Sequence, residues 1–305
     1  MSRFLNLTAL DSHFAILNFD QIGSKVNVLS TPMWLEFEEI LTKLAERSDL
    51  QGVILQSTKP GIFIAGADLK ELENASPENL APTRAYLELG HRVLRQLESL
   101  HCPTVAIIDG VCLGGGFEVA LACDFRLVGS HPKVQIGFPE VNLGLLPGWG
   151  GTQRIARLRG PMEALRYVCS MVMLNAEQAS AEGVAMKMVP SEQLLENARS
   201  LLIESRESGS WLEQRRIKQE PWHDETMPPP GINAEKMLHE SMTQYMEQLP
   251  GPARGPSLEA VNVIFQGSQR PFEEGLRLET EAFLRLAGSQ ESRTMIEEFF
   301  ARKKK

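Results

Sequence analysis

Three consecutive glycines between a predicted strand and a predicted helix restrict most strongly how this chain can fold. Residues 105–108 are apolar and largely β-branched, as is typical of a strand, whereas residues 117–123 favour a helix. Without Cβ atoms, Gly114, Gly115 and Gly116 allow another group to approach the main chain, and they expose N–H groups at the start of the helix. Such donors can stabilise an oxygen that gains negative charge during a reaction.

Two glutamates are the candidate catalytic groups. Glu118 lies in the first turn of the predicted helix, where it is either a charge that stabilises the helix start or a catalytic carboxylate. Glu140 follows Phe138 and Pro139 in an apolar loop, where the alternative is an ordinary loop acid. Desolvation and mutual repulsion can separate the pKa values of two such acids, so we expect Glu118 to be an ionised base and Glu140 a protonated acid.

The composition excludes several classes of protein. The chain has 305 residues, 43% of them hydrophobic, which is enough for one large domain or a domain with an appendage. The net charge of −8 gives no general attraction to nucleic acid or to anionic membranes. No stretch is apolar over a length that could span a membrane, and we expect no signal peptide.

The four cysteines show no CxxC spacing, so we expect free thiols and no metal site. Free thiols indicate a reducing compartment, which predicts a cytoplasmic location, or the mitochondrial matrix if the source is eukaryotic.

The order of the predicted elements indicates an α/β fold with a helical end. Strands and helices alternate in the first half, whereas the chain after residue 160 is mostly helical. A proline-rich stretch near residues 220–231 reads as an exposed connection. We therefore expect a core that carries the active site over residues 1–195 and a helical region over residues 196–305, in a layer separable from that core.

Four motifs, in order, resemble those of the crotonase (enoyl-CoA hydratase/isomerase) superfamily. They are residues 65–72 (AGADLKEL), 114–118 (GGGFE), 137–140 (GFPE) and 147–154 (PGWGGTQR). The resemblance runs from about residue 10 to residue 195. The last eighty residues resemble the end of the hydratase part of multifunctional fatty-acid β-oxidation α-subunits. The resemblance implies a spiral of ββα units, with two sheets surrounded by helices and a helical C-terminal region.

The resemblance also implies roles for individual residues. The thioester carbonyl of an acyl-CoA would bind the backbone N–H groups of Ala67 and Gly115. Glu118 and Glu140 would flank the double bond, and water would rest between both acids and the N–H of Gly148. The loop that would wrap the coenzyme A part of the substrate consists of Ala65, Gly66, Ala67, Asp68, Leu69 and Lys70.

Four of the candidate residues have an ordinary alternative. Asp68 is more often a helix cap than a ligand at such a position. Lys70 either meets the pyrophosphate or is simply solvated. Phe138 and Trp149 line the acyl pocket or belong to the core.

The function implied by the resemblance is addition of water to a trans-2-enoyl-CoA, giving a 3-hydroxyacyl-CoA in fatty-acid β-oxidation, with Δ3-Δ2 isomerisation as an accompanying activity. The alternatives are another crotonase-fold thioester enzyme and a CoA-binding piece of a multienzyme complex. No cofactor is expected, since coenzyme A is part of the substrate. We expect a homo-oligomer, with dehydrogenase and thiolase components of β-oxidation as candidate partners. The sequence specifies neither the acyl chain length nor whether the chain is a piece of a longer polypeptide.

Overall fold

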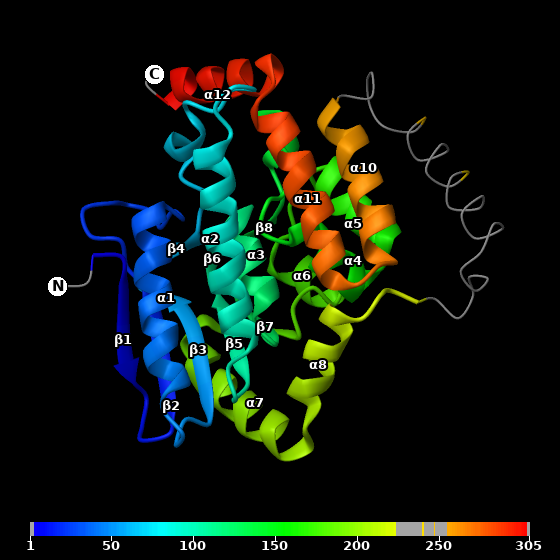
Figure 1. Ribbon diagram of the computed structural model, residues 1–305. Coiled ribbons are helices and arrows are strands. Elements are labelled where there is room, and N and C mark those ends of the chain that lie inside the picture. The colour runs from blue at the N-terminus through cyan, green and yellow to red at the C-terminus, as the bar shows by residue number, and fades with distance from the viewer. Residues whose placement is uncertain (1–2, 224–239, 241–246, 248–254, 304–305) are drawn as a thin grey trace.

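The computed structural model describes residues 3–223, 240, 247 and 255–303. Nine strands in this part of the chain form two sheets (Figure 1). The larger sheet has the order β1 (Leu5–Ala9), β2 (Phe14–Phe19), β3 (Gly52–Ser57), β5 (Thr104–Ile108), β7 (Phe125–Gly129) and β9 (Lys187–Val189). The smaller sheet has the order β4 (Gly61–Ile64), β6 (Gly110–Leu113) and β8 (Gln135–Gly137). All neighbours are parallel except β1 and β2.

The ββα unit recurs along the chain, which confirms the predicted fold class. Each unit places its first strand in the larger sheet and its second strand in the smaller sheet, and then continues into a helical segment. The units are β3–β4–α2 (Ala81–Glu98), β5–β6–α3 (Gly115–Ala122) and β7–β8–α4 (Gly151–Arg159). Strand β5 is buried along its whole length. That burial explains the continuous apolar run, because a parallel strand in the middle of a sheet is covered on both faces.

The other helices cover the sheets and pack on one another. Helix α1 begins after Ser30, whose side chain accepts a hydrogen bond from the N–H of Met33, and it has a proline in its first turn. The remaining α-helices are α1 (Thr31–Ala45), α5 (Pro161–Cys169), α6 (Ala176–Ala181), α7 (Leu194–Ser208), α8 (Ser210–Gln219), α10 (Gly255–Ser268), α11 (Phe272–Ala287) and α12 (Gln290–Lys303). Short 3-10 helices are η1 (Leu69–Leu72), η2 (Glu140–Leu143) and η3 (Ser191–Gln193).

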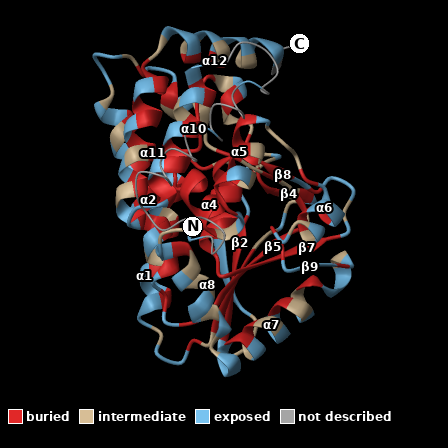
Figure 2. Ribbon diagram, turned by 90° about the vertical axis from the view of Figure 1, so that its right-hand side faces the viewer, coloured by how far each residue is buried: buried red, intermediate tan, exposed pale blue. Residues whose placement is uncertain are grey.

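Helices of the C-terminal region pack on the core. Helices α10 and α11 lie beside α4 and α5, and Ile264 and Phe283 belong to the same buried core as α3 and α4 (Figures 1 and 2). Leu194, Ala198 and Leu202 of α7 pack on the larger sheet. Residue 195, the predicted end of the core, lies inside this helix. The helix continues past it because apolar residues at every fourth position cover the apolar face of the sheet.

The proline-rich connection predicted near residues 220–231 falls outside the described residues from residue 224 onward. The boundary between two domains therefore stays a prediction.

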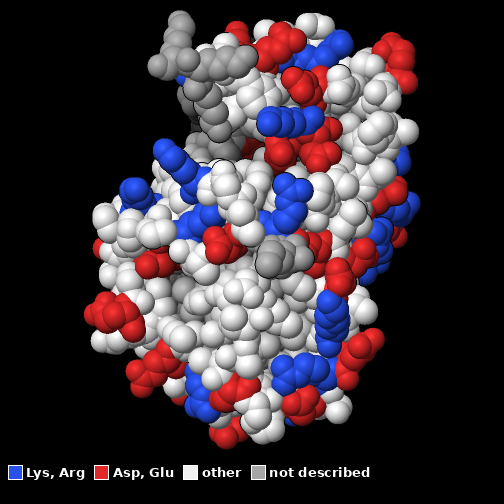
Figure 3. Space-filling view, turned by 90° about the vertical axis from the view of Figure 1, so that its left-hand side faces the viewer, with Lys and Arg blue, Asp and Glu red and all other residues white. Residues whose placement is uncertain are grey.

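The surface carries charges of both signs. On the face shown in Figure 3, acidic and basic side chains are interspersed. None of the described helices combines the length and the apolar composition that a membrane crossing requires.

Candidate active site

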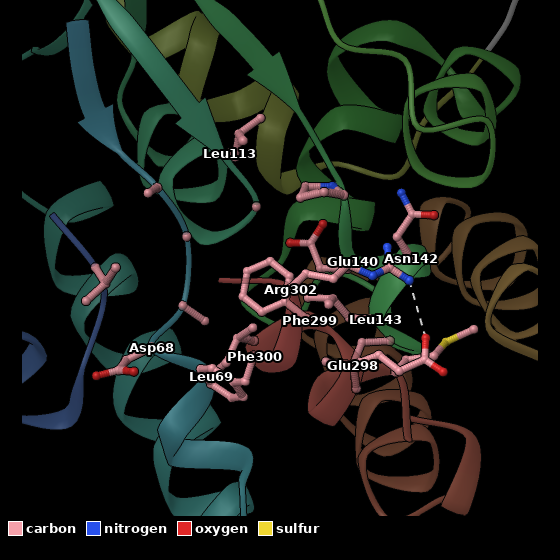
Figure 4. A pocket seen from close by; sticks show the side chains of 18 of the residues that line it. Asp68, Leu69, Leu113, Glu140, Asn142, Leu143, Glu298, Phe299, Phe300 and Arg302 are labelled. Atoms are coloured by element: carbon pink, nitrogen blue, oxygen red, sulfur yellow. Dashed lines mark hydrogen bonds and ion pairs between the residues drawn. The ribbon is translucent and has the colours of Figure 1, made fainter. Parts of the chain in front are cut away.

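A cavity of about 820 Å³ brings together three of the four sequence motifs and the last helix (Figure 4). Its wall is formed by the loop after β4, the end of β6, the η2 region and α12. The lining residues are Val26, Val28, Ala65, Gly66, Ala67, Asp68, Leu69, Leu113, Gly114, Pro139, Glu140, Asn142, Leu143, Leu145, Met295, Glu298, Phe299, Phe300 and Arg302. Such a cavity, mostly apolar with a few polar groups, is suited to a small organic ligand.

The glycine turn forms part of this wall through Gly114. Other residues are not tolerated at this position, because of its backbone conformation and because Glu140 lies close to it. The φ of Gly114 is +53°, and a Cβ atom built there would lie 2.6 Å from Oε1 of Glu140. The neighbouring Gly115 is closed in by Trp149, whose ring would lie 2.6 Å from an added Cβ. The first glycine therefore admits a carboxylate, and the second admits an aromatic ring.

Two backbone donors lie where the ends of adjacent strands meet. Ala67 follows β4, and Gly115 follows β6, which pairs with β4 in parallel. Neither N–H donates a hydrogen bond within the described part of the chain. Gly115 is the first residue of α3, so its N–H has no partner inside the helix. This pair can stabilise a carbonyl oxygen that becomes negative.

Glu118 is buried in α3 and is held by backbone groups from another helix. Its Oε1 accepts hydrogen bonds of 2.7 Å from the N–H groups of both Trp149 and Gly151, at the start of α4. Burial raises the pKa of Glu118 to about 7, and these two N–H groups lower it, with smaller contributions from Arg154 and the Gly148 backbone. The expectation of a readily ionised Glu118 needs correction, because desolvation outweighs the backbone donors.

Glu140, the first residue of η2, lines the cavity. Its Oε2 is buried and has no hydrogen-bond partner among the described residues. Burial raises the pKa of Glu140 well above its usual range, and the charges of Glu118 and Glu279 raise it further. A protonated carboxyl group is therefore favoured at this position, in the direction that the sequence predicted.

Gly148 lies beside Glu118, since its backbone contributes to the pKa of that carboxyl group. A Cβ atom on Gly148 would lie 2.8 Å from the ring of Phe283 and 2.9 Å from Leu87, so glycine is needed there for packing. Its role in holding water stays a prediction.

The loop expected to wrap coenzyme A is only partly in the cavity wall. Residues 65–69 line the cavity, whereas Lys70 is exposed and is not part of the lining. Asp68 caps η1, because its Oδ1 accepts a hydrogen bond of 3.2 Å from the N–H of Lys70. In Figure 4 the Asp68 carboxylate points away from Glu140.

The two aromatic residues proposed for the acyl pocket lie in the core instead. Phe138 is fully buried and packs on Phe117, with ring centroids 4.8 Å apart. Trp149 packs edge-on against Trp34 and Tyr86, at 5.1 Å from each. Neither lines the cavity. Their surroundings come from helices distant in the sequence, so the local motif could not decide between pocket and core.

Sequence reasoning missed two contributors to the site. Helix α12 places Met295, Phe299 and Phe300 in the cavity wall. This role could not be predicted, because the helix is far along the chain from the motifs that form the rest of the wall. Glu279 of α11 is fully buried and accepts hydrogen bonds from the Gly150 and Thr152 N–H groups. A charged residue on the apolar stripe of a helix was the available signal for Glu279.

Neither a metal centre nor a reactive thiol emerges from the described residues. No group of three or more His, Cys, Asp or Glu side chains among them could hold a metal ion. The four cysteines are free and buried, and burial raises the pKa of each thiol, that of Cys112 well above its usual range.

Known proteins resemble this chain over nearly its whole length. The sequence model of the enoyl-CoA hydratase/isomerase family matches residues 19–253. Curated relatives include the fatty acid oxidation complex subunit alpha of Shewanella frigidimarina, 34% identical over 301 residues, and that of Vibrio parahaemolyticus, 34% identical over 298 residues. These alignments cover 99% and 97% of this chain and 41% of each relative.

Solved structures share the fold. An enoyl-CoA hydratase from Bacillus halodurans aligns with a TM-score of 0.69 at 17% identity, over 97% of this chain and 99% of that one. The human mitochondrial delta3-delta2-enoyl-CoA isomerase aligns with a TM-score of 0.68 at 22% identity, over 99% of this chain and 98% of that one. At such identities the likeness concerns the fold alone.

Proposed function

Because the chain belongs to the enoyl-CoA hydratase/isomerase family, we propose that it adds water to trans-2-enoyl-CoA thioesters and releases 3-hydroxyacyl-CoA. The observation that carries this proposal is the presence of two buried carboxyl groups, Glu118 and Glu140, near the ends of β4 and β6, where the N–H groups of Ala67 and Gly115 donate no hydrogen bond within the described part of the chain. The first pair can move protons, and the second can accept the charge that develops on a thioester oxygen.

The reaction needs one base, one acid and an oxyanion site. In the proposed mechanism Glu118 removes a proton from water while the water oxygen bonds to C3 of the enoyl group. The electrons of the double bond move onto the thioester oxygen, which the N–H groups of Ala67 and Gly115 stabilise. Glu140 then gives its proton to C2, so that H and OH have both been added. Glu118 leaves the cycle with a proton and Glu140 without one, and exchange with solvent or between the two acids restores them.

Isomerisation is the second candidate activity. A carboxylate that removes a proton from one carbon of an enoyl thioester, and returns it to another, can shift the double bond with the same oxyanion site. The similarity in fold to an enoyl-CoA isomerase favours testing it. Hydration remains the primary proposal because both carboxyl groups are present.

The place of this chain in a larger enzyme is also a proposal. It spans 41% of the length of the curated relatives. Since those relatives are named as subunits of a fatty acid oxidation complex, we infer that dehydrogenase and thiolase activities use its product, whether on the same polypeptide or on partners. Assembly into a homo-oligomer and a cytoplasmic or mitochondrial-matrix location stay predictions.

The test is a hydration assay with trans-2-enoyl-CoA substrates of graded length, followed by the loss of enoyl-thioester absorbance. We expect turnover of the thioesters and none of the matching free enoic acids, since the oxyanion and coenzyme A contacts need the thioester. Isomerase activity is measured separately with a 3-enoyl-CoA. Equal turnover of free acid and thioester would contradict the proposal.

A further inference from the structure

Four consecutive N–H groups at the start of α4 are divided between two buried carboxylates. Those of Trp149 and Gly151 donate to Oε1 of Glu118. Those of Gly150 and Thr152 donate to Glu279, over 2.5 Å and 3.0 Å respectively. Glu279 and Glu118 therefore bind the same turn, and each accepts hydrogen bonds from every second residue of it.

The Glu279 side chain is buried, and its hydrogen-bond donors come from the turn before α4 and the first residues of that helix. It comes from α11, and the hydroxyl group of Thr152 donates to it as well. Burial and the charge of Glu118 raise the pKa of Glu279 to about 8, whereas the hydrogen bonds from Thr152 and from the Gly150 backbone lower it and favour the carboxylate. A buried carboxylate without a full counter-ion is costly, so the backbone donors of the turn are what make Glu279 tolerable there.

The other side of the turn is held independently. Nη1 of Arg154 donates to the carbonyl oxygen of Trp149 over 2.6 Å, and the same guanidinium forms a two-fold hydrogen bond with Glu98 of α2. Gly150 adopts φ +90°, which glycine tolerates better than other residues. The turn is therefore defined by Arg154 through a carbonyl group and by Glu279 through two N–H groups.

We propose that Glu279 is a positioning residue for the proposed hydration: it fixes the turn from Trp149 to Thr152, so that the N–H groups of Trp149 and Gly151 hold the Glu118 carboxylate in place. The inference rests on the proposed function, because it assigns Glu118 a part in the reaction. Glu279 itself does not line the cavity and acts through the turn.

The test compares Glu279→Gln with a matched control on the same helix. The amide of glutamine has nearly the same size but places an NH₂ group against one of the two N–H groups of the turn, so the grip is lost on that side. The control is Glu281→Gln, the same chemical change at an exposed residue that pairs with Arg84. A displacement of the turn by about 1 Å costs about 100-fold in kcat.

We expect Glu279→Gln to lose about that factor in kcat, with KM changed by less than about threefold, because substrate contacts are untouched. Glu281→Gln should match the wild type. A kcat per folded molecule within about threefold of the wild type for Glu279→Gln would overturn the inference.

Hydrogen exchange of overlapping peptides separates this inference from the proposed function. Glu279→Gln should speed exchange of the Trp149 and Gly151 amides, although their acceptor, Glu118, is unaltered. Unchanged exchange of these two amides would overturn the positioning role, whether or not the protein hydrates enoyl-CoA. If wild type and Glu281→Gln are both inactive, the proposed function fails and the exchange result alone decides this inference.

A second variant covers the case in which Glu279→Gln does not fold. Thr152→Val removes one donor to Glu279 and leaves the carboxylate present, and Thr152→Ser is its control because it keeps the hydroxyl group. We expect Thr152→Val to lose about tenfold in kcat and to speed exchange of the Trp149 amide. If Thr152→Val and Thr152→Ser behave alike, the proposed grip is refuted.

Discussion

Replacing Gly114 by alanine tests whether the glycine turn serves to admit Glu140. A Cβ atom at this position would lie 2.6 Å from Oε1 of Glu140. The carboxyl oxygen would have to move by about 0.8 Å to reach an ordinary contact distance of 3.4 Å. Because misplacement by about 1 Å costs about 100-fold, we expect Gly114→Ala to lose about 100-fold in kcat.

The same substitution also strains the backbone, and a control shows how far positive-φ strain by itself affects activity. Gly114 has φ +53°, so alanine there costs about 1–3 kcal/mol of stability. Gly209 has φ +76° and nothing within 4 Å of an added Cβ, so Gly209→Ala introduces positive-φ strain without a contact. It should lose about 1 kcal/mol of stability and keep wild-type activity.

The assay is hydration of a trans-2-enoyl-CoA at a temperature where both variants are folded, as judged by circular dichroism and thermal unfolding. Activity of Gly114→Ala within about fivefold of that of Gly209→Ala would refute the reasoning. A crystal structure of Gly114→Ala with Glu140 in its original position would refute it as well.

Further predictions concern the two acids. Glu118→Gln and Glu140→Gln should each lose on the order of 10²–10⁴ in kcat, and the losses should not multiply in the double variant, as kinetics of all three will show. With a saturated acyl-CoA in deuterated water, Glu118→Gln should keep part of the α-proton exchange and Glu140→Gln should lose it; the reverse pattern, read by mass spectrometry, would exchange the two roles. Burial raises the pKa of Glu118 to about 7, where the charge of Arg154 lowers this pKa and a charge on Glu279 raises it. Because a base must be ionised, kcat/KM should fall as the pH drops through about 7. A flat profile from pH 6 to pH 8, about one unit on either side, would argue against Glu118 as the base. A chelator should leave activity unchanged, because the carboxyl groups suffice for both proton transfers; loss with EDTA and recovery with a metal ion would contradict this.

The pKa of Glu118 also links pH to stability. Its value in the folded state is raised above the ordinary 4.5 to about 7, so its contribution to stability is fully present below pH 4.5 and is lost as the pH rises through about 7. Unfolding of Glu118→Gln by urea should show a weaker dependence on pH than the wild type, because the raised pKa values of Glu140 and Glu279 still contribute in the same direction. The carboxylate that we propose as the catalytic base therefore destabilises the fold at alkaline pH.

The sequence predicted an alternation of strands and helices because the signals for single elements are local, whereas the ββα arrangement was implied by the family resemblance. The apolar run over residues 105–108 became β5, and the glycines led into α3 at Gly115. Strand β6, between them, was not separated from the turn. Four residues at the start of a glycine loop are too few to show a period.

The parts that could not be predicted depend on contacts between distant segments. Trp149 lies among Trp34 and Tyr86, and Glu279 reaches a turn 127 residues away in the chain. Neither relation leaves a periodic pattern near the residue concerned. The pKa of Glu118 was misjudged for a related reason: its helix suggested an ionised group, whereas the desolvation that raises the pKa comes from the whole surrounding core.

The central claim is that two carboxyl groups of this chain add water across an enoyl thioester. The most direct measurement is incubation of the purified chain with a trans-2-enoyl-CoA in ¹⁸O-labelled water, followed by mass spectrometry of the product. We predict a 3-hydroxyacyl-CoA that carries one ¹⁸O atom, formed by the wild type and nearly absent with Glu118→Gln or Glu140→Gln. Unlabelled product, or labelled product formed at the wild-type rate by either variant, would contradict the account.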